Sequence, residues 1–232
     1  MKQKSIRFVK DYMVKKGFVL CFMCSFIFSQ DKLLLKQADI LTSSTTESET
    51  ITKLDGNVVF QKTDTILKGN FANQSNQNSI INLYGDVSIE QPNQTIYCDS
   101  LSYDSDTEFF SMYGHIKIKN GSRLISADKA TLDQNSNQIN LIENCEISEK
   151  NNNKVYGDKI ILDFKDESLQ SLRVLSNGTI LTQNSGYEKI DNQLQIIENE
   201  DILKGETIFA SFQNDTIKTI EIVGMASTLI HL

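Results

Sequence analysis

A glycine-centred motif returns every 29 residues in the middle of this chain, and this repetition constrains the fold more than any other feature. Its clear copies are Leu54-Asp55-Gly56-Asn57-Val58, Leu83-Tyr84-Gly85-Asp86-Val87 and Met112-Tyr113-Gly114-His115-Ile116. A fourth copy, Leu141-Ile142-Glu143-Asn144-Cys145, keeps the spacing with Glu143 in place of glycine. Repeats of about 20–50 residues are typical of stacked, structurally similar units.

Two series of aspartates keep nearly the same step. They are Asp99, Asp128 and Asp158, and Asp104, Asp133 and Asp163, spaced 29 and then 30 residues apart. The extra residue lies in the turn at 151–153. Three landmarks in one register indicate that the repeat is structural.

Each unit holds two alternating runs of apolar and polar residues, separated by Asn, Asp, Gly and Ser. This pattern predicts antiparallel strands joined by hairpin turns. We expect sequential strands over 96–103, 108–118, 123–132 and 138–148. Residues 35–42 could start a short helix or form a strand, and 42–50 are polar and predict a loop. From residue 165 the register loosens, with an irregular stretch between 184 and 201.

Period-2 alternation places equivalent apolar residues of successive units in columns on one face. A flat sheet would leave this face in water, which is unfavourable at about 25 cal/mol per Å². Mid-strand glycine often marks a bend, so the glycines at 56, 85 and 114 predict a crease at one height. The sequence therefore predicts an all-β protein, an antiparallel meander folded into an open, taco-like β-jelly-roll trough of ~29-residue repeats.

The meander also predicts the state of two cysteines. Cys98 and Cys145 would lie three strands apart, about 14 Å at ~4.8 Å per strand. This separation exceeds the reach of a disulfide, so we expect free thiols.

The first 29 residues have the features of a secretory signal peptide. A basic segment precedes twelve mostly apolar residues, 17–28, and the small residue Ser29. Twelve residues are too few to span a bilayer, which needs about 20. Cleavage after Ser29 would leave 17 basic and 29 acidic residues, a formal charge of −12. Such a chain is poorly suited to bind nucleic acid.

The sequence shows little that could support catalysis. It has no nucleophile elbow, phosphate-binding loop or Cys-x-x-Cys pair after residue 29, and no set of zinc ligands or cofactor motif. His115 is expected to be solvated and without a partner motif. The column of Asp99, Asp128 and Asp158 is expected to be solvated at a strand bend, because a calcium ladder would need glycine-rich nonapeptides. We therefore expect neither an enzyme nor a metal site.

The repeated Gly-Asn/Asp-Val openings, the Ala-Asp or Cys-Asp step and the Tyr-Asp or Leu-Asp turn resemble the OstA-like (LptA) family of periplasmic lipopolysaccharide-transport proteins. The resemblance covers about 50–165 well and 200–232 more loosely. It divides the chain into a signal peptide (1–29), a lead-in with a polar loop (30–50), an OstA-like repeat domain (51–165) and a continuation of irregular register (166–232), which could be a second partial unit.

The resemblance implies a periplasmic protein that shields lipopolysaccharide acyl chains inside the trough and stacks head to tail, through strand edges, in a bridge with transport proteins of the inner and outer membranes. The lining residues that it implies are Val58, Phe60, Ile89, Ile96, Leu101, Phe110, Met112, Ile118, Ile125, Leu132 and Ile147. Because the charge of −12 suits phosphates poorly, recognition would rest on the acyl chains or on rim lysines such as Lys117 and Lys119.

Two alternatives stay open. The N-terminal segment could be retained as an anchor, which would make the chain a membrane-bound subunit of a lipopolysaccharide exporter with the same fold. The apolar columns could instead form a closed, dry core of an extracytoplasmic β-scaffold.

Overall fold

The computed structural model describes residues 33–47, 49–149, 152–165, 168–190, 193–213 and 216–229. Within these ranges it contains one antiparallel sheet and no helix, so none that could cross a membrane. The strands are β1 (Leu34–Gln37), β2 (Ile40–Thr45), β3 (Thr50–Lys62), β4 (Thr65–Ser75), β5 (Ile80–Gln91), β6 (Gln94–Asp104), β7 (Phe109–Asn120), β8 (Arg123–Asp133), β9 (Gln138–Ser148), β10 (Lys154–Lys165), β11 (Ser168–Ile190), β12 (Gln193–Gln213), β13 (Thr216–Val223) and β14 (Ser227–Leu229). The predicted signal peptide lies outside the described residues.

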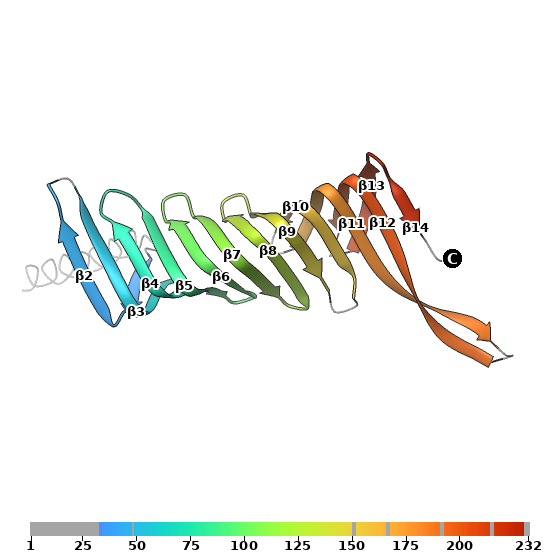
Figure 1. Cartoon of the computed structure of the whole chain (residues 1–232), viewed down its shortest axis with the longest axis horizontal. Helices are drawn as coiled ribbons and strands as arrows, with labels where there is room; N and C mark the ends of the chain where they lie inside the picture. The colour runs from blue at the N-terminus through green and yellow to red at the C-terminus, as the bar shows by residue number, and fades with distance from the viewer. Residues whose placement is uncertain are drawn as a thin grey trace, which may run out of the picture. The chain divides into compact units, whose positions relative to one another are not determined.

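The strands from β3 to β13 pair in the order of the sequence, which confirms the predicted meander. Figure 1 shows them side by side, with the colour changing steadily from blue to red. At one end β1 and β2 both pair with β3, and at the other β13 and β14 both pair with β12. The described strands therefore form an open sheet, not a closed barrel.

The predicted crease exists and is made by β-bulges. Pairing of β3 with β4 skips between Asp55 and Val58, and the same interruption recurs at each later pair up to β11–β12. Gly114 and His115 have φ of +76° and +43°, the left-handed region that glycine adopts without strain. Glu143 and Asn144 repeat this geometry at +65° and +51° without glycine. Loss of the glycine at 143 therefore does not interrupt the crease.

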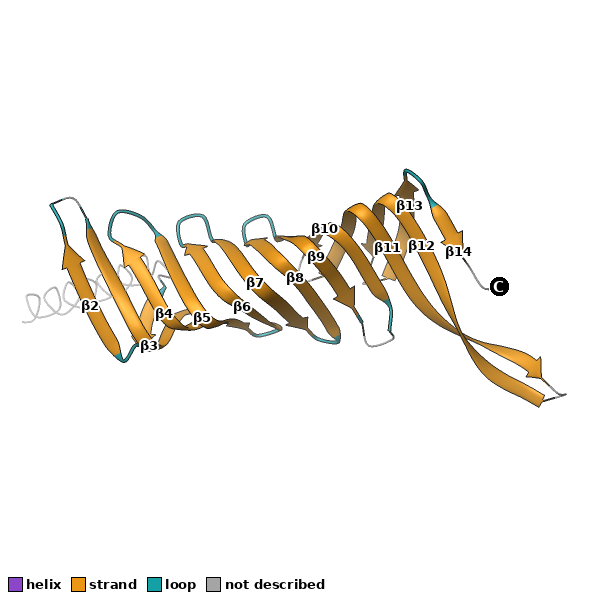
Figure 2. Ribbon diagram, in the orientation of Figure 1, coloured by secondary structure: helices purple, strands orange, loops and turns teal. Residues whose placement is uncertain are grey.

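The crease divides the sheet into two leaves. The first leaf contains β2, the N-terminal halves of β3, β5, β7 and β9, the C-terminal halves of β4, β6, β8 and β10, the N-terminal part of β11, the C-terminal part of β12, and β13. The second leaf contains β1, β14 and the remaining half of each of β3 to β12. Figure 2 shows the strands of the sheet joined by short turns, with β14 as a short strand at the C-terminal end. Each leaf ends in a rim of hairpin turns.

The column of aspartates is exposed at the crease, as expected, and each aspartate also has a partner on the next strand. The imidazole Nδ1 of His115 lies 2.7 Å from Oδ2 of Asp99, so His115 is exposed but has a partner. The Nδ2 of Asn144 donates to Asp128 at 2.6 Å, and that of Asn177 donates to Asp158 at 2.7 Å. These side chains join the two strands where the ladder of backbone hydrogen bonds is interrupted.

Two aspartates of the second series, Asp104 and Asp133, close turns at the rim of the first leaf. Oδ1 of Asp104 accepts from the backbone N–H of Asp106 at 3.0 Å, and Oδ1 of Asp133 accepts from that of Asn135 at 2.9 Å. Such Asx turns favour tight connections. The hydrogen bond from Ser79 lowers the pKa of Asp104, and that from Ser136 lowers the pKa of Asp133.

Three local predictions need correction or completion. Residues 35–42 form parts of the two strands β1 and β2, not a helix. The polar loop expected over 42–50 is shorter, because β2 continues to Thr45 and β3 begins at Thr50. The irregular stretch 184–201 belongs to one long hairpin of β11 and β12, whose pairing continues to Ile190 and Gln193. This hairpin interrupts the 29-residue period (Figure 1).

The inner faces of the two leaves enclose one cluster of buried apolar residues that runs from Leu54 on β3 to Ala210 on β12. Phe110 stacks on Tyr103 with ring centroids 4.4 Å apart. The predicted columns therefore lie in one cluster, and we call this buried cluster between the two leaves the interior.

Candidate functional site

All eleven predicted lining residues lie in this interior, and each is at most 7% exposed. Val58, Ile89, Ile96 and Met112 are fully buried at 0%. The structure thus brings the predicted residues together as a packed core. Two of them, Leu132 and Ile147, line the two hollows described below.

The two rims face each other along a seam. At the β3 end, Lys62 on the second leaf pairs with Glu108 on the first. This hydrogen bond raises the pKa of Lys62, while burial raises the pKa of the nearby Tyr103 hydroxyl. We call Lys62, Glu108 and Tyr103 the clasp, because they join the two leaves across the seam.

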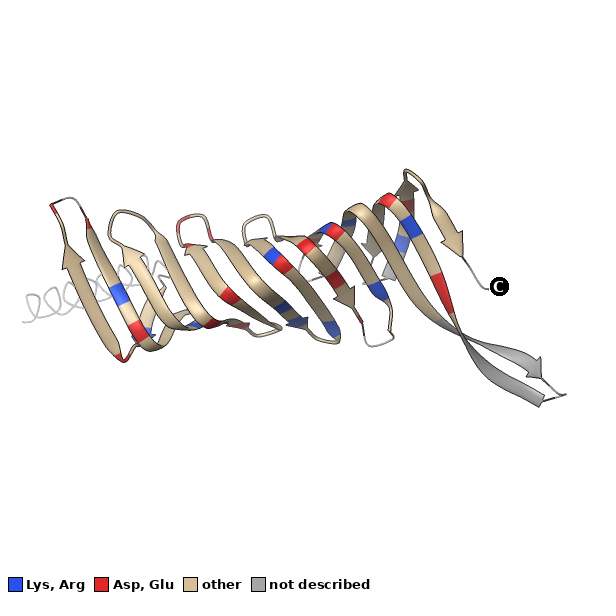
Figure 3. Cartoon of the chain, viewed as in Figure 1, with Lys and Arg blue, Asp and Glu red and all other residues tan. Residues whose placement is uncertain are grey.

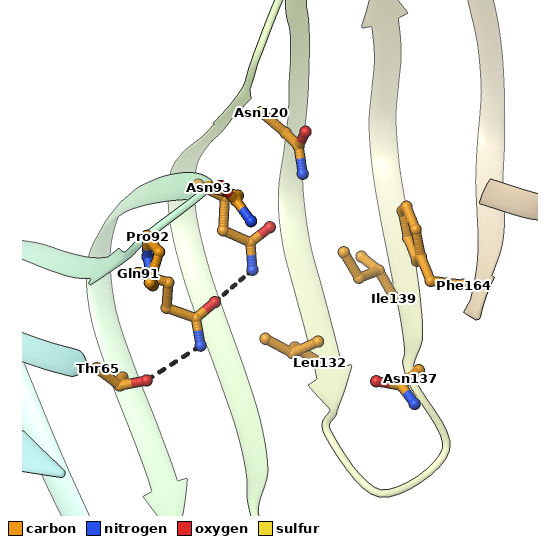
Figure 4. A pocket seen from close by; sticks show the side chains of 10 residues that line it. Thr65, Gln91, Pro92, Asn93, Asn120, Leu132, Asn137, Ile139 and Phe164 are labelled. Atoms are coloured by element: carbon orange, nitrogen blue, oxygen red, sulfur yellow. Dashed lines mark hydrogen bonds between the residues drawn. The ribbon is translucent and has the colours of Figure 1, made fainter. Parts of the chain in front are cut away.

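A hollow of about 280 Å³ opens in the seam beyond the clasp. Figure 4 shows that its floor is apolar, with Leu132, Ile139 and Phe164 of the first leaf. Amide side chains surround it, among them Gln91 and Gln94, which are joined by a 2.5 Å hydrogen bond. Such a hollow can hold an amphiphile with an uncharged polar part at the mouth.

A second hollow lies further along the seam, between β8 and β12. Its lining is mostly apolar and includes Leu162, Leu172, Ile180 and Phe212 from both leaves. Arg123, Glu149 and Lys154 stand among the lining residues, and the guanidinium of Arg123 lies 3.0 Å from Glu149. We call this the C-terminal hollow.

The apolar columns predicted from the sequence leave out five apolar residues that line these hollows: Phe164, Ile180, Leu181, Ala210 and Phe212. The available signal was the period-2 alternation of Leu162 with Phe164 and of Ala210 with Phe212. It was overlooked because the 29-residue register ends near 165.

Charged side chains are mixed in sign along the strands (Figure 3). The two lysines expected at the rim are exposed near the end of β7. Lys119 extends over the Tyr97 ring on the outer face, with 5.5 Å between Nζ and the ring centroid. Neither lysine lines a hollow described above.

The cysteines at 98 and 145 are free and buried, as predicted. Burial raises the pKa of Cys98 to about 12 and that of Cys145 to about 11. Both thiols are therefore protonated at neutral pH and poorly nucleophilic. The described residues hold no group of three or more His, Cys, Asp or Glu that could bind a metal ion.

Both ends of the sheet expose apolar side chains. Leu34 and Leu41 are more than half exposed at one end, and Val223 and Leu229 are at the other. Edge strands with unpaired backbone groups are ready templates for pairing with another chain.

Comparison with known proteins gives one family match. The family described as "OstA-like protein" matches residues 30–152, just over half of the chain. No curated protein was found to match. A similar solved structure is that of LptH from Pseudomonas aeruginosa, described as the LptA homologous periplasmic component of the conserved lipopolysaccharide transport device. It shares 14% identity over 72% of this chain and 95% of that chain, with a TM-score of 0.27, too low to support any argument.

Proposed function

This chain belongs to the OstA-like family, and from that premise we propose that it is a periplasmic, non-enzymatic lipid-binding protein. It shields the acyl chains of lipopolysaccharide between its two leaves during transport to the outer membrane. The observation that carries the proposal is a continuous apolar interior that opens to solvent in two hollows along one seam.

Acyl chains enter this interior by parting the leaves. The packed interior leaves no free channel beside Val58 or Met112, so lipid must replace contacts between side chains of opposite leaves. Exposing apolar surface costs about 25 cal/mol per Å², but a hydrocarbon chain covers the same surface again. The exchange is therefore close to neutral, which suits a protein that must also release its ligand.

The contacts that hold the two leaves together differ along the seam. The clasp holds the β3 end through Lys62 and Glu108. The C-terminal hollow is lined by apolar side chains of both leaves, such as Leu172 of the first leaf and Ile180 of the second. We propose that the leaves part first at this hollow and last at the clasp.

The two ends support a role in a head-to-tail assembly. Strands β1 and β2 at one end and β13 and β14 at the other lie at the edges of the sheet. Pairing of such edges would continue the apolar interior from one molecule to the next, or to transport proteins of either membrane. If this is correct, Leu41→Lys reduces the apparent mass of the chain at high concentration, measured by analytical ultracentrifugation. A wild-type chain that is monomeric throughout contradicts this part.

Export remains part of the proposal. Residues 1–29 would be removed on the way to the periplasm, whereas the anchored-subunit alternative keeps them. Mass spectrometry of the chain recovered from its native host distinguishes the two.

Photo-crosslinking tests the lipid proposal directly. Benzoylphenylalanine replaces Phe164 in the first hollow, Phe212 in the C-terminal hollow, or Tyr97 on the outer face as a control of the same shape. After addition of lipopolysaccharide, we expect crosslinks from the two hollows and none from Tyr97. A folded protein that crosslinks at neither hollow would instead be a dry-core scaffold, in which the two leaves do not part.

A further inference from the structure

The outer face of the first leaf carries a row of exposed aromatic rings. Phe71, Tyr84 and Tyr113 are 51%, 43% and 49% exposed. Phe71 lies opposite Tyr84, Tyr84 opposite Ser100, and Ser100 opposite Tyr113. The three rings therefore stand in one line across β4 to β7, strands that Figure 1 shows side by side. We call these three residues the aromatic row.

A line of amide and hydroxyl side chains runs beside the aromatic row. On the same face, each strand carries a polar residue two positions from its member of the first line. These polar residues lie directly opposite one another on neighbouring strands, and they are Asn73, Asn82, Ser102 and Ser111. The Nδ2 of Asn82 donates to Oδ1 of Asn73 at 3.0 Å. The first three of these residues also line a shallow hollow of about 440 Å³ on this face.

The chemistry of this face selects one class of ligand. The hollow contains one acidic and one basic residue, Glu49 and Lys53, so it offers no net charge to a phosphate. Amides and hydroxyls both donate and accept hydrogen bonds, as sugar hydroxyls and acetamido groups require. The electron-rich faces of aromatic rings attract the C–H groups of a sugar ring.

The spacing of the rings favours a linear polymer. Tyr84 and Tyr113 stand on β5 and β7, two strand spacings or about 10 Å apart. This separation is close to one disaccharide of an extended β-1,4-linked glycan. Two equivalent sugars of such a strand can therefore stack on the two tyrosines while the intervening sugar passes over Ser100.

We propose that the outer face of the first leaf binds an N-acetylated, β-1,4-linked glycan strand. We identify this strand as the glycan of the bacterial cell wall, and this identification rests on the export proposed above. Glycan binding itself is independent of lipid binding, because the aromatic row and the interior lie on opposite faces of the same leaf. Such binding would hold the protein in the cell wall that lies between the two membranes.

Two probes test the proposal on the purified chain. Protein-free cell-wall sacculi are sedimented with the chain, and chitohexaose, a soluble β-1,4-linked N-acetylglucosamine oligomer, is titrated by calorimetry. We expect the wild-type chain to bind both, and Tyr84→Ala and Tyr113→Ala each to weaken binding at least tenfold. Cellohexaose, which lacks the acetamido groups, should also bind at least tenfold more weakly.

Tyr97 supplies the matched control. It is a tyrosine of the same 43% exposure on the outer face of the second leaf, and Tyr97→Ala should leave binding unchanged. A wild-type chain that binds neither probe overturns the proposal, as does an equal loss in all three variants. Equal affinity for cellohexaose overturns the recognition of acetamido groups.

Crosslinking of lipopolysaccharide at Phe164 separates the two proposals. If Tyr84→Ala loses the glycan but keeps the lipid crosslink, the two faces act independently, as proposed. If the wild-type chain crosslinks lipid but binds no glycan, only the glycan proposal fails.

Discussion

The repeat-built part of the sheet, β3 to β9, differs from the part from β10 to β14 in the length of its hairpins and in how its two leaves meet. In the first part the hairpins end alternately at the two rims, the clasp joins these rims at the β3 end, and the first hollow opens in the seam beyond it. In the second, β11 and β12 run past the rim as a long hairpin, and the C-terminal hollow lies beside their base. The two parts therefore differ in strand length: the regular hairpins place Lys62 and Glu108 of opposite rims within reach of each other, whereas the long hairpin carries β11 and β12 past the level of the rim.

The largest expected effect contrasts one phenylalanine from each part. Phe110 is 1% exposed and stacked on Tyr103, so Phe110→Ala should lower the free energy of unfolding by about 3–5 kcal/mol. Phe212 is only partly buried beside the C-terminal hollow, and Phe212→Ala should cost about 1–2 kcal/mol. Urea unfolding measures both. Equal losses would mean that the second part is packed as tightly as the first.

The next largest effect is expected from two substitutions at the crease of the repeat-built part. A Cβ at Gly114 would lie 2.1 Å from Oδ2 of Asp99 in a left-handed backbone conformation, so Gly114→Ala should cost about 2 kcal/mol. Glu143→Gly should instead stabilise the chain by about 0.5–1 kcal/mol, because glycine adopts the φ of +65° without strain. The exposed pair of Glu143 with Lys129 contributes less than this gain.

Thermal unfolding followed by circular dichroism checks the pair of crease variants. Shifts of the midpoint in the same direction for both would show that the glycine position does not control the crease.

A smaller effect concerns the clasp. Lys62→Met should cost at most about 1 kcal/mol but should increase the rate of lipopolysaccharide crosslinking at Phe164. Lys68→Met is the control, because Lys68 pairs with Glu90 on the same leaf, at 2.6 Å, and lines neither hollow. Equal crosslinking rates in wild type and Lys62→Met would argue against a clasp.

The pH dependence of the clasp has a defined sign. The hydrogen bond to Glu108 raises the pKa of Lys62 above the usual 10.5. The contribution of the clasp to stability is therefore fully present below pH 10.5 and is lost as the pH rises through the raised pKa. Lys62→Met should remove this part of the pH dependence of unfolding.

The smallest expected effect is a difference in the alkylation rates of the two cysteines, which shows in which part of the sheet the leaves open first. Both buried thiols have raised pKa values, so native alkylation should be slow at pH 8 and stay slow to pH 10, while the unfolded chain reacts faster as pH rises. Because an unfolded thiol ionises first, stability also falls above about pH 9. Cys145, on β9 beside the second part, should react before Cys98. Peptide mass spectrometry measures the order, and the reverse order would place the first opening in the repeat-built part.

The shared apolar interior was predictable from the sequence, whereas the positions of its two hollows were not. Side chains two residues apart on a strand share a face, so the alternation around residues such as Phe60, Met112 and Ile125 placed the lining residues together in advance. The hollow-lining residues Phe164 and Phe212 escaped because the reasoning depended on the 29-residue register, which the long hairpin ends. His115 gained its partner Asp99 from a neighbouring strand 16 positions away, a pairing that no local pattern reveals.

The sequence by itself determined the strands of the 29-residue repeat, their order, the crease and the unpaired state of Cys98 and Cys145, because these follow from local periodicity and from glycine in a left-handed conformation. Only the tertiary structure decided how closely the two leaves approach, where the seam opens and which residues form the clasp. The physical reason is that the distance between leaves depends on side-chain volumes from strands far apart in sequence. The alternation of apolar and polar residues shows which face of the sheet a side chain occupies. Only the folded structure shows which side chain of the other leaf packs against it.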